Sequence, residues 1–300
     1  MLTIFYENIL PILLLSGAGF VLGKTLKLDS RPLARIIFYI LSPALVFNLI
    51  SGSELSFQKI FHMMAYSAAV MLACAGVAFL AGKLLRLERA ALTVAVLTSL
   101  IANNGNFGLS VVSLAFGQEA LAYASIYFVT SSLVLYTLGV LLASLGHLNL
   151  KASFINLLKV PAVYAIILAM VFLRTGWSLP SPVAWTLSKA ADAAIPCMLI
   201  LLGLELQKAE WTRNLRALSI PVVIRLVVGP LIGLGMAAVF GLQGNARLAG
   251  VTEAGMPSAV MNAILAAEYK LDASIVSAVI FIGTVLSPLT LTPLLYFLGR

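Results

Sequence analysis

Two polar interruptions stand inside otherwise apolar stretches of the chain. The first runs from Asn103 to Ser110 and contains three amides and two glycines; the second runs from Glu253 to Ser258, with Asn262 close behind. Glycine and proline weaken or break a helix, and side-chain amides can replace the backbone partners that a break removes. A helix broken in this way exposes an N-terminus with free N–H groups, which can hold an anion without a basic side chain.

The side chains in these interruptions supply two kinds of ligand group. Amides, hydroxyls and freed backbone groups suit an anion, so we expect substrate to be bound by Asn103, Asn104, Asn106, Ser110, Pro257, Ser258 and Asn262. A carboxylate with amide oxygens suits a hard cation, so we expect any Na⁺ site to be formed by Glu253, Asn103 and Asn106.

Glu253 leaves several interpretations open. A charged side chain at the centre of a membrane helix costs about 2.5–3.5 kcal/mol unless it is partnered or hydrated. Glu253 could ligate Na⁺ or carry a proton, form a structural pair with Arg225, or face a water-filled cavity. Arg225 could itself pair with a carboxylate or extend to the membrane interface. Lys189 and Asp192, three residues apart, are expected to pair with each other on one helix face.

Other chemistries lack the residues that they require. The chain has only two histidines, His62 and His147, with no HExxH motif, and it has no glycine-rich phosphate loop followed by lysine. An intramembrane hydrolase and an ATP-driven pump are therefore disfavoured, and we expect neither enzymatic activity nor a cofactor apart from a coupling Na⁺ or H⁺. Cys74 and Cys197 lie in apolar segments and are expected to be buried rather than disulfide-bonded.

The elements that carry these interruptions must be membrane helices. Of the 300 residues, 61% are hydrophobic and 10% are charged, a composition that excludes a soluble domain. The apolar stretches match the bilayer thickness, and they are too long and continuous for barrel strands. The net charge of +8 comes from basic residues between these stretches, so it indicates membrane topology rather than nucleic-acid binding.

Hydropathy, with charges and Gly or Pro as boundaries, predicts an all-α protein of ten transmembrane helices. Thirteen of the 19 Lys and Arg residues follow odd-numbered spans and four follow even-numbered spans or end the chain, so we expect a multi-pass plasma-membrane protein with both termini outside. The interruptions fall in spans four and nine. The predicted spans are 6–24, 34–52, 60–83, 89–115, 119–146, 157–174, 182–206, 217–241, 246–267 and 272–298.

The two halves of the chain resemble each other at an offset of about 150 residues. Residues 114–126 recur in part at 265–275, and the stretch from Pro43 to Leu55 is echoed from Pro196 to Leu206. Because each half contains an odd number of spans, the second must be inverted in the membrane. We therefore expect two five-helix repeats, residues 1–150 and 151–300, whose broken helices meet near the bilayer midplane.

The chain resembles the auxin efflux carrier family, the PIN-like proteins with bacterial and archaeal members. The resemblance covers nearly the whole sequence and is carried by LSPALVFNLI in span 2, NNGNFGLSVVSLAFG in span 4, IPCMLILLGLEL in span 7, EAGMPSAVMNAILAAEY in span 9 and GTVLSPLTLTP in span 10. It implies a scaffold and a transport domain, crossing broken helices 4 and 9, and a homodimer. It also implies organic-anion substrates.

The same resemblance assigns roles to particular residues. The family's span-4 asparagine falls on Asn103, and its crossover prolines fall on Ser110 and Pro257, so Ser110 departs from the pattern. The segment from Glu253 to Met256 is more similar to the related bile acid sodium symporters, in which an acid at this point helps to bind sodium.

These observations favour one functional hypothesis over its alternatives. We expect a secondary active transporter of small organic anions, such as malate, malonate or auxin-like acids, that works by alternating access and is coupled to Na⁺ or H⁺. The alternatives are an uncoupled carrier driven by the membrane potential, and a ligand receptor or channel that accumulates nothing. The expected partners are an organic anion and the lipid bilayer.

Overall fold

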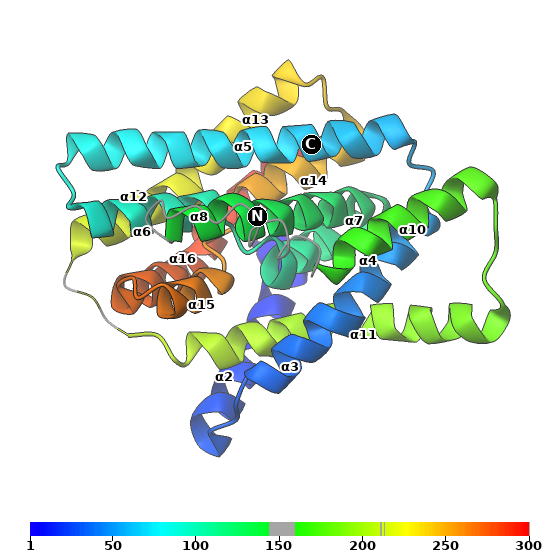
Figure 1. Cartoon of the computed structure of the whole chain (residues 1–300), viewed down its shortest axis with the longest axis horizontal. Coiled ribbons are helices and arrows are strands. Elements are labelled where there is room, and N and C mark those ends of the chain that lie inside the picture. The colour runs from blue at the N-terminus through cyan, green and yellow to red at the C-terminus, as the bar shows by residue number, and fades with distance from the viewer. Residues whose placement is uncertain (144–159, 211, 213, 300) are drawn as a thin grey trace.

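A computed structural model describes residues 1–143, 160–210, 212 and 214–299 as a bundle of helices (Figure 1). Seven helices within these residues are long and apolar enough to cross a bilayer, which confirms the all-helical membrane class. They are α1 (Leu2–Ile4) to α2 (Leu10–Leu26), α3 (Arg31–Ile36) to α4 (Ser42–Ser51), α5 (Phe57–Leu84), η3 (Asn104–Gly108) through α7 (Leu109–Val134) to α8 (Val140–Ala143), α11 (Ser181–Leu206), α12 (Leu215–Val223) to α13 (Gly229–Val239), and α16 (Ala273–Leu298).

Shorter helices and π-helical turns complete the described bundle. The shorter helices are α6 (Arg89–Leu100), α10 (Pro161–Thr175), α14 (Gly244–Ala254) and α15 (Met261–Glu268). The π-helical turns are η1 (Phe5–Ile9), η2 (Ile37–Leu41), η3 (Asn104–Gly108), η4 (Leu135–Gly139) and η5 (Ile224–Val228).

Helical residues occupy most of the described part of every predicted span. Residues 144–146 of the fifth span, residues 157–159 of the sixth and the expected repeat boundary at 150/151 lie outside the described residues. The backbone leaves the helical conformation at Gly117, with φ 77° and ψ −166°, between the predicted ends of the fourth and fifth spans.

Large apolar side chains cover the outside of the bundle. Leu14, Leu80, Leu231 and Leu289 are each more than 60% exposed. A soluble protein would bury side chains of this kind, whereas lipid tails solvate them at no cost. The exposed surface therefore belongs in the hydrocarbon of the membrane.

Helices α2 and α11 pack closely through small residues. A Cβ added at Gly19 would overlap the carbonyl oxygen of Ile200, and one added at Gly203 would overlap that of Ser16. Only glycine allows the two backbones to approach so closely, as is common between helices in membranes.

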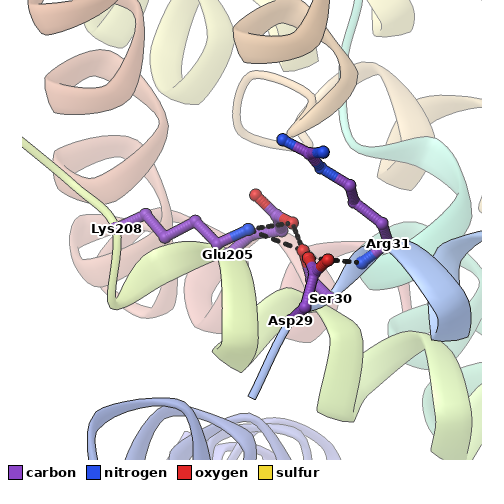
Figure 2. A network of polar contacts seen from close by, with 5 residues as sticks. All are labelled: Asp29, Ser30, Arg31, Glu205 and Lys208. Atoms are coloured by element: carbon purple, nitrogen blue, oxygen red, sulfur yellow. Dashed lines mark hydrogen bonds and ion pairs between the residues drawn. The ribbon is translucent and has the colours of Figure 1, made fainter. Parts of the chain in front are cut away.

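A polar network closes one end of this helix pair (Figure 2). Ser30, in the connection between α2 and α3, donates a hydrogen bond to Oε1 of Glu205 at the end of α11. Lys208 Nζ donates to Ser30 Oγ at 2.6 Å and to the same carboxylate oxygen at 3.0 Å (Figure 2). Near the other end of α11, the predicted pair of Lys189 and Asp192 is confirmed, with Nζ and Oδ2 3.0 Å apart.

Candidate functional site

The first interruption separates α6 from η3. Residues Ile101 to Asn103 are not helical, and Ile101 has the extended angles φ −106° and ψ 111°. The helix resumes as a π-helical turn, in which Gly108 N donates to Asn103 O at 2.9 Å. The break therefore begins two residues before the predicted stretch, and Ser110 lies inside α7, where its hydroxyl is fully buried.

The second interruption separates α14 from α15. Glu253 and Ala254 are the last residues of α14, and the chain stays outside an α-helix from Gly255 to Val260. Pro257 has no N–H and disfavours a helical conformation in the residue before it, so the helix cannot continue through this segment.

The two interrupted segments pair with each other, and we call them together the crossing (residues 101–103 and 255–260). Asn103 N donates to Pro257 O at 2.7 Å, and Ala259 N donates to Ile101 O at 3.0 Å. These bonds form an antiparallel bridge between Ala102 and Ser258. They satisfy backbone groups that would be costly to leave unpaired inside a membrane, and they join two segments about 150 residues apart.

Asn262, in the first turn of α15, stabilises the crossing by hydrogen bonds to both of its segments. Its Nδ2 donates to Ile101 O at 3.0 Å and to Ser258 Oγ at 2.9 Å, and its side chain is fully buried. Pro257, Ser258 and Asn262 were predicted to contact substrate. In this structure their hydrogen bonds hold the two broken helices together.

Arg225, in η5, caps the two half-helices that end at the crossing. Its guanidinium donates to Met256 O at 3.0 Å, to Ala254 O at 3.1 Å and to Ser99 O at 3.3 Å. A cation at a helix C-terminus opposes the partial negative charge of the last carbonyls, and here one side chain serves two such ends.

Of the two interpretations considered for Arg225 from the sequence, extension to the membrane interface is wrong, and no direct ion pair replaces it. The side chain is only 1% exposed, so it does not extend to the membrane interface. No ion pair within 4.0 Å joins Arg225 to Glu253 among the ion pairs of the described residues. The sequence could not reveal this role because the acceptors are backbone carbonyls on distant helices.

Glu253 is fully buried in the last turn of α14. Asn104 Nδ2 donates to Glu253 Oε2 at 2.7 Å and to Glu253 O at 3.0 Å. The carboxylate also lies against the backbone of Gly108, where an added Cβ would overlap Oε2 and lie 2.7 Å from Oε1. Asn104 is thus the amide that meets Glu253, whereas Asn103 and Asn106 were the predicted partners.

Two buried oxygen atoms at this contact, Glu253 Oε1 and Asn104 Oδ1, have no hydrogen-bond partner among the described residues. Three N–H groups of Arg225 donate to backbone carbonyls, and the one side-chain hydrogen bond that Glu253 accepts within the described residues comes from Asn104. A buried carboxylate with an unpaired oxygen is costly as a bare charge, so a proton or a bound cation would stabilise it. Carboxylate and amide oxygens are the ligands that hard cations prefer.

A small cavity of about 70 Å³ lies beside the crossing. Asn103 and Asn106 line it, together with Ser131 and Ser132 from α7 and Met261 at the start of α15. No side chain caps the N-terminus of η3 or of α15. Two half-helix N-termini, each with partial positive charge, therefore border one cavity, and no Lys or Arg is among the described residues that line it.

The sequence analysis did not single out Ser131 and Ser132. The sequence does contain a feature that could have pointed to them: three consecutive hydroxyl residues, Thr130 to Ser132, stand within an apolar span. Such a run is ambiguous, because hydroxyls in membrane helices also bond to their own backbone. Ser132 Oγ does so here, donating to Phe128 O at 3.1 Å.

Comparison with known proteins identifies the family. The profile of the family described as "Membrane transport protein" matches residues 4–295, which is nearly the whole chain. The chain belongs to this membrane transport protein family. The protein is therefore a membrane transporter.

Three relatives support this assignment. An uncharacterized transporter of Methanothermobacter thermautotrophicus is 28% identical over 290 residues, which cover 95% of each chain. An uncharacterized transporter of Methanocaldococcus jannaschii is 26% identical over 296 residues, covering 95% of this chain and 96% of the relative. Auxin efflux carrier component 6 of Arabidopsis thaliana is 27% identical over 144 residues, covering 46% of this chain and 25% of the relative.

The predicted resemblance to auxin efflux carriers is thus confirmed. These relatives are named as transporters and carriers, and none of these names is that of an enzyme.

Proposed function

We propose that this membrane transport family protein carries small organic anions by alternating access. The observation that supports this best is the cavity at the crossing, which two uncapped half-helix N-termini border together with Asn103 and Asn106. A carboxylate placed there would accept hydrogen bonds from amides and from backbone N–H groups. The cavity is large enough for several water molecules, which is the scale of a small carboxylate such as malonate.

The proposed architecture is ten membrane helices in two inverted repeats, residues 1–150 and 151–300. In this arrangement α6 with the start of α7 forms the fourth span, Gly117 marks the turn into the fifth, and α14 with α15 forms the ninth. Substrate would cross when the bundle that carries the crossing moves against the rest of the protein. Both termini would face outside at the plasma membrane, as the distribution of basic residues predicts.

The proposed coupling ion binds at Glu253, on the α14 side of the crossing. Its unpaired Oε1, with the unpaired amide oxygen of Asn104, offers two oxygen ligands for Na⁺, and the same carboxylate offers one site for H⁺. Asn104 and Asn103 are adjacent in sequence, so binding at Glu253 would act directly on the cavity that holds the anion. This adjacency provides a physical route for coupling the cation to the substrate.

Uptake into proteoliposomes tests the proposal. Purified protein is reconstituted, and a panel of labelled mono- and dicarboxylates is supplied under an imposed Na⁺ gradient, an imposed H⁺ gradient, or neither. We expect at least one carboxylate to accumulate above its external concentration under one of the ion gradients. Uptake that only equilibrates would indicate an uncoupled carrier, and binding without uptake would favour a receptor.

A further inference from the structure

A second cavity, of about 400 Å³, lies where α5 ends and α6 begins, at the opposite end of α6 from the crossing. Figure 1 shows these two helices side by side, joined by a short connection at one end of the bundle. The lining of the cavity combines two basic side chains, which we call the rim, with several apolar side chains, which we call the groove. The lining includes Phe79, Lys83, Arg89, Leu92, Val96 and Leu142.

The rim of the cavity is strongly basic. Lys83, Arg86 and Arg89 lie within seven residues of one another, with Glu88 as the one acid among them. Lys83 and Arg89 line the cavity itself, and Lys83 Nζ lies 5.6 Å from the centre of the Phe79 ring. A cation–π contact of this kind holds the ammonium group close to the apolar groove.

The depth of the cavity matches the boundary between lipid headgroups and acyl chains. Helix α5 has 28 residues and is therefore about 42 Å long, whereas the hydrocarbon core is about 30 Å thick. Because Lys83 is in the last turn of α5, we expect this residue at headgroup level. Leu92 and Val96 follow one and two turns into α6, which places the groove at the depth of the acyl chains.

We propose that this cavity binds an anionic phospholipid. The headgroup phosphate contacts Lys83 and Arg89, and one acyl chain lies along Leu92, Val96 and Leu142. Charge complementarity favours a phosphate at the basic rim, and the apolar groove favours a lipid over a free anion. This site shares no lining residue with the cavity at the crossing, so it does not depend on the proposed transport mechanism.

Local fluorescence quenching tests the proposal. Phe79→Trp is introduced into a chain whose Trp177, Trp185 and Trp211 are replaced by phenylalanine, so that the only tryptophan reports on the groove. The protein in detergent is titrated with brominated phosphatidylglycerol and, separately, with brominated phosphatidylcholine. We expect the anionic lipid to quench at a concentration at least tenfold lower than the zwitterionic lipid.

Charge variants show whether the rim is responsible. Lys83→Gln with Arg89→Gln should weaken phosphatidylglycerol binding by about 25-fold, because each basic residue near an anionic lipid contributes about fivefold. The matched control is Lys24→Gln with Lys27→Gln, which removes the same charge at exposed positions that do not line the cavity. This control should change binding by less than twofold.

Three results would overturn the proposal: equal quenching by the two lipids, an equal loss in the control pair, or displacement of the lipid by equimolar inorganic phosphate. The last result would show that the groove contributes nothing. Thermal unfolding of each variant identifies any loss of binding that comes from misfolding, and the more conservative pair Lys83→Arg with Arg89→Lys should retain binding.

Discussion

Replacing Arg225 is expected to weaken the crossing more than any other single change of charge. Arg225→Gln leaves at most two donors, on a shorter side chain, for three carbonyls that now lie 3.0, 3.1 and 3.3 Å from the guanidinium. A hydrogen bond to a charged group contributes about 1.5–3 kcal/mol. Losing two of the three bonds should therefore cost about 3–6 kcal/mol of folding free energy. Arg225→Lys keeps the charge but not the planar fork, so we expect an intermediate loss.

Two measurements test this predicted loss of folding free energy. Unfolding in mixed detergent micelles gives the change in stability, with Arg247→Gln as a control at an exposed position, expected to stay within about 0.5 kcal/mol. Hydrogen exchange at the amides of Asn103 and Ala259 reports on the crossing itself, because these two amides form its bridge. Both amides should exchange faster in Arg225→Gln, and both should be unchanged in the control.

A double-mutant cycle separates backbone capping from an ion pair with Glu253. If Arg225 acted mainly through that carboxylate, adding Glu253→Gln to Arg225→Gln would restore most of the lost stability. Capping predicts that the coupling energy is less than half of the cost of Arg225→Gln alone. Near-complete rescue by Glu253→Gln, or unchanged exchange at Asn103 and Ala259, would refute the capping role.

Two further substitutions test the cation site. Glu253→Gln keeps an acceptor for Asn104 but removes the charge. Uptake should therefore lose its dependence on Na⁺ or H⁺, while the unfolding temperature stays close to that of the wild type. Full ion stimulation in this variant would show the cation role to be wrong. Gly108→Ala places a methyl group in the volume of the Glu253 carboxylate and should cost about 1–3 kcal/mol and abolish ion stimulation. Gly76→Ala, whose Cβ meets nothing within 4 Å, is the matched control, and identical behaviour of the two alanine variants in stability and uptake would contradict the assigned contact.

The sequence predicted what depends on local composition. Apolar length predicted the membrane helices, and the paired Gly, Pro and amide interruptions pointed to both breaks within a few residues. The first break still begins at Ile101, an apolar residue with no local signal. What makes Ile101 non-helical is its pairing with Ala259, a residue 158 positions away, and that contact cannot be inferred from either segment alone.

The contacts of the polar side chains were harder to predict for the same reason. Glu253 was identified as a buried carboxylate that needs a partner, yet three asparagines in the fourth span were equally plausible partners by type. The π-helical turn decides among them, since it directs Asn104 towards Glu253 and leaves Asn103 and Asn106 at the cavity. Arg225 was recognised as unusual for a membrane span. Its hydrogen-bond acceptors could not be predicted, because every residue has a backbone carbonyl and the sequence does not show which carbonyls lie near the guanidinium.

Substrate protection of the cavity tests the proposed anion site most directly. Ser132→Cys is introduced with Cys74→Ala and Cys197→Ala, and its alkylation by a small charged thiol reagent is timed in proteoliposomes. The carboxylate that gives the greatest uptake should slow this alkylation, and a carboxylate that is not transported should not; a cysteine at the exposed Ser181 should react at the same rate with either. Transport that continues unchanged after complete modification of Ser132→Cys would contradict the assignment of the anion to the crossing.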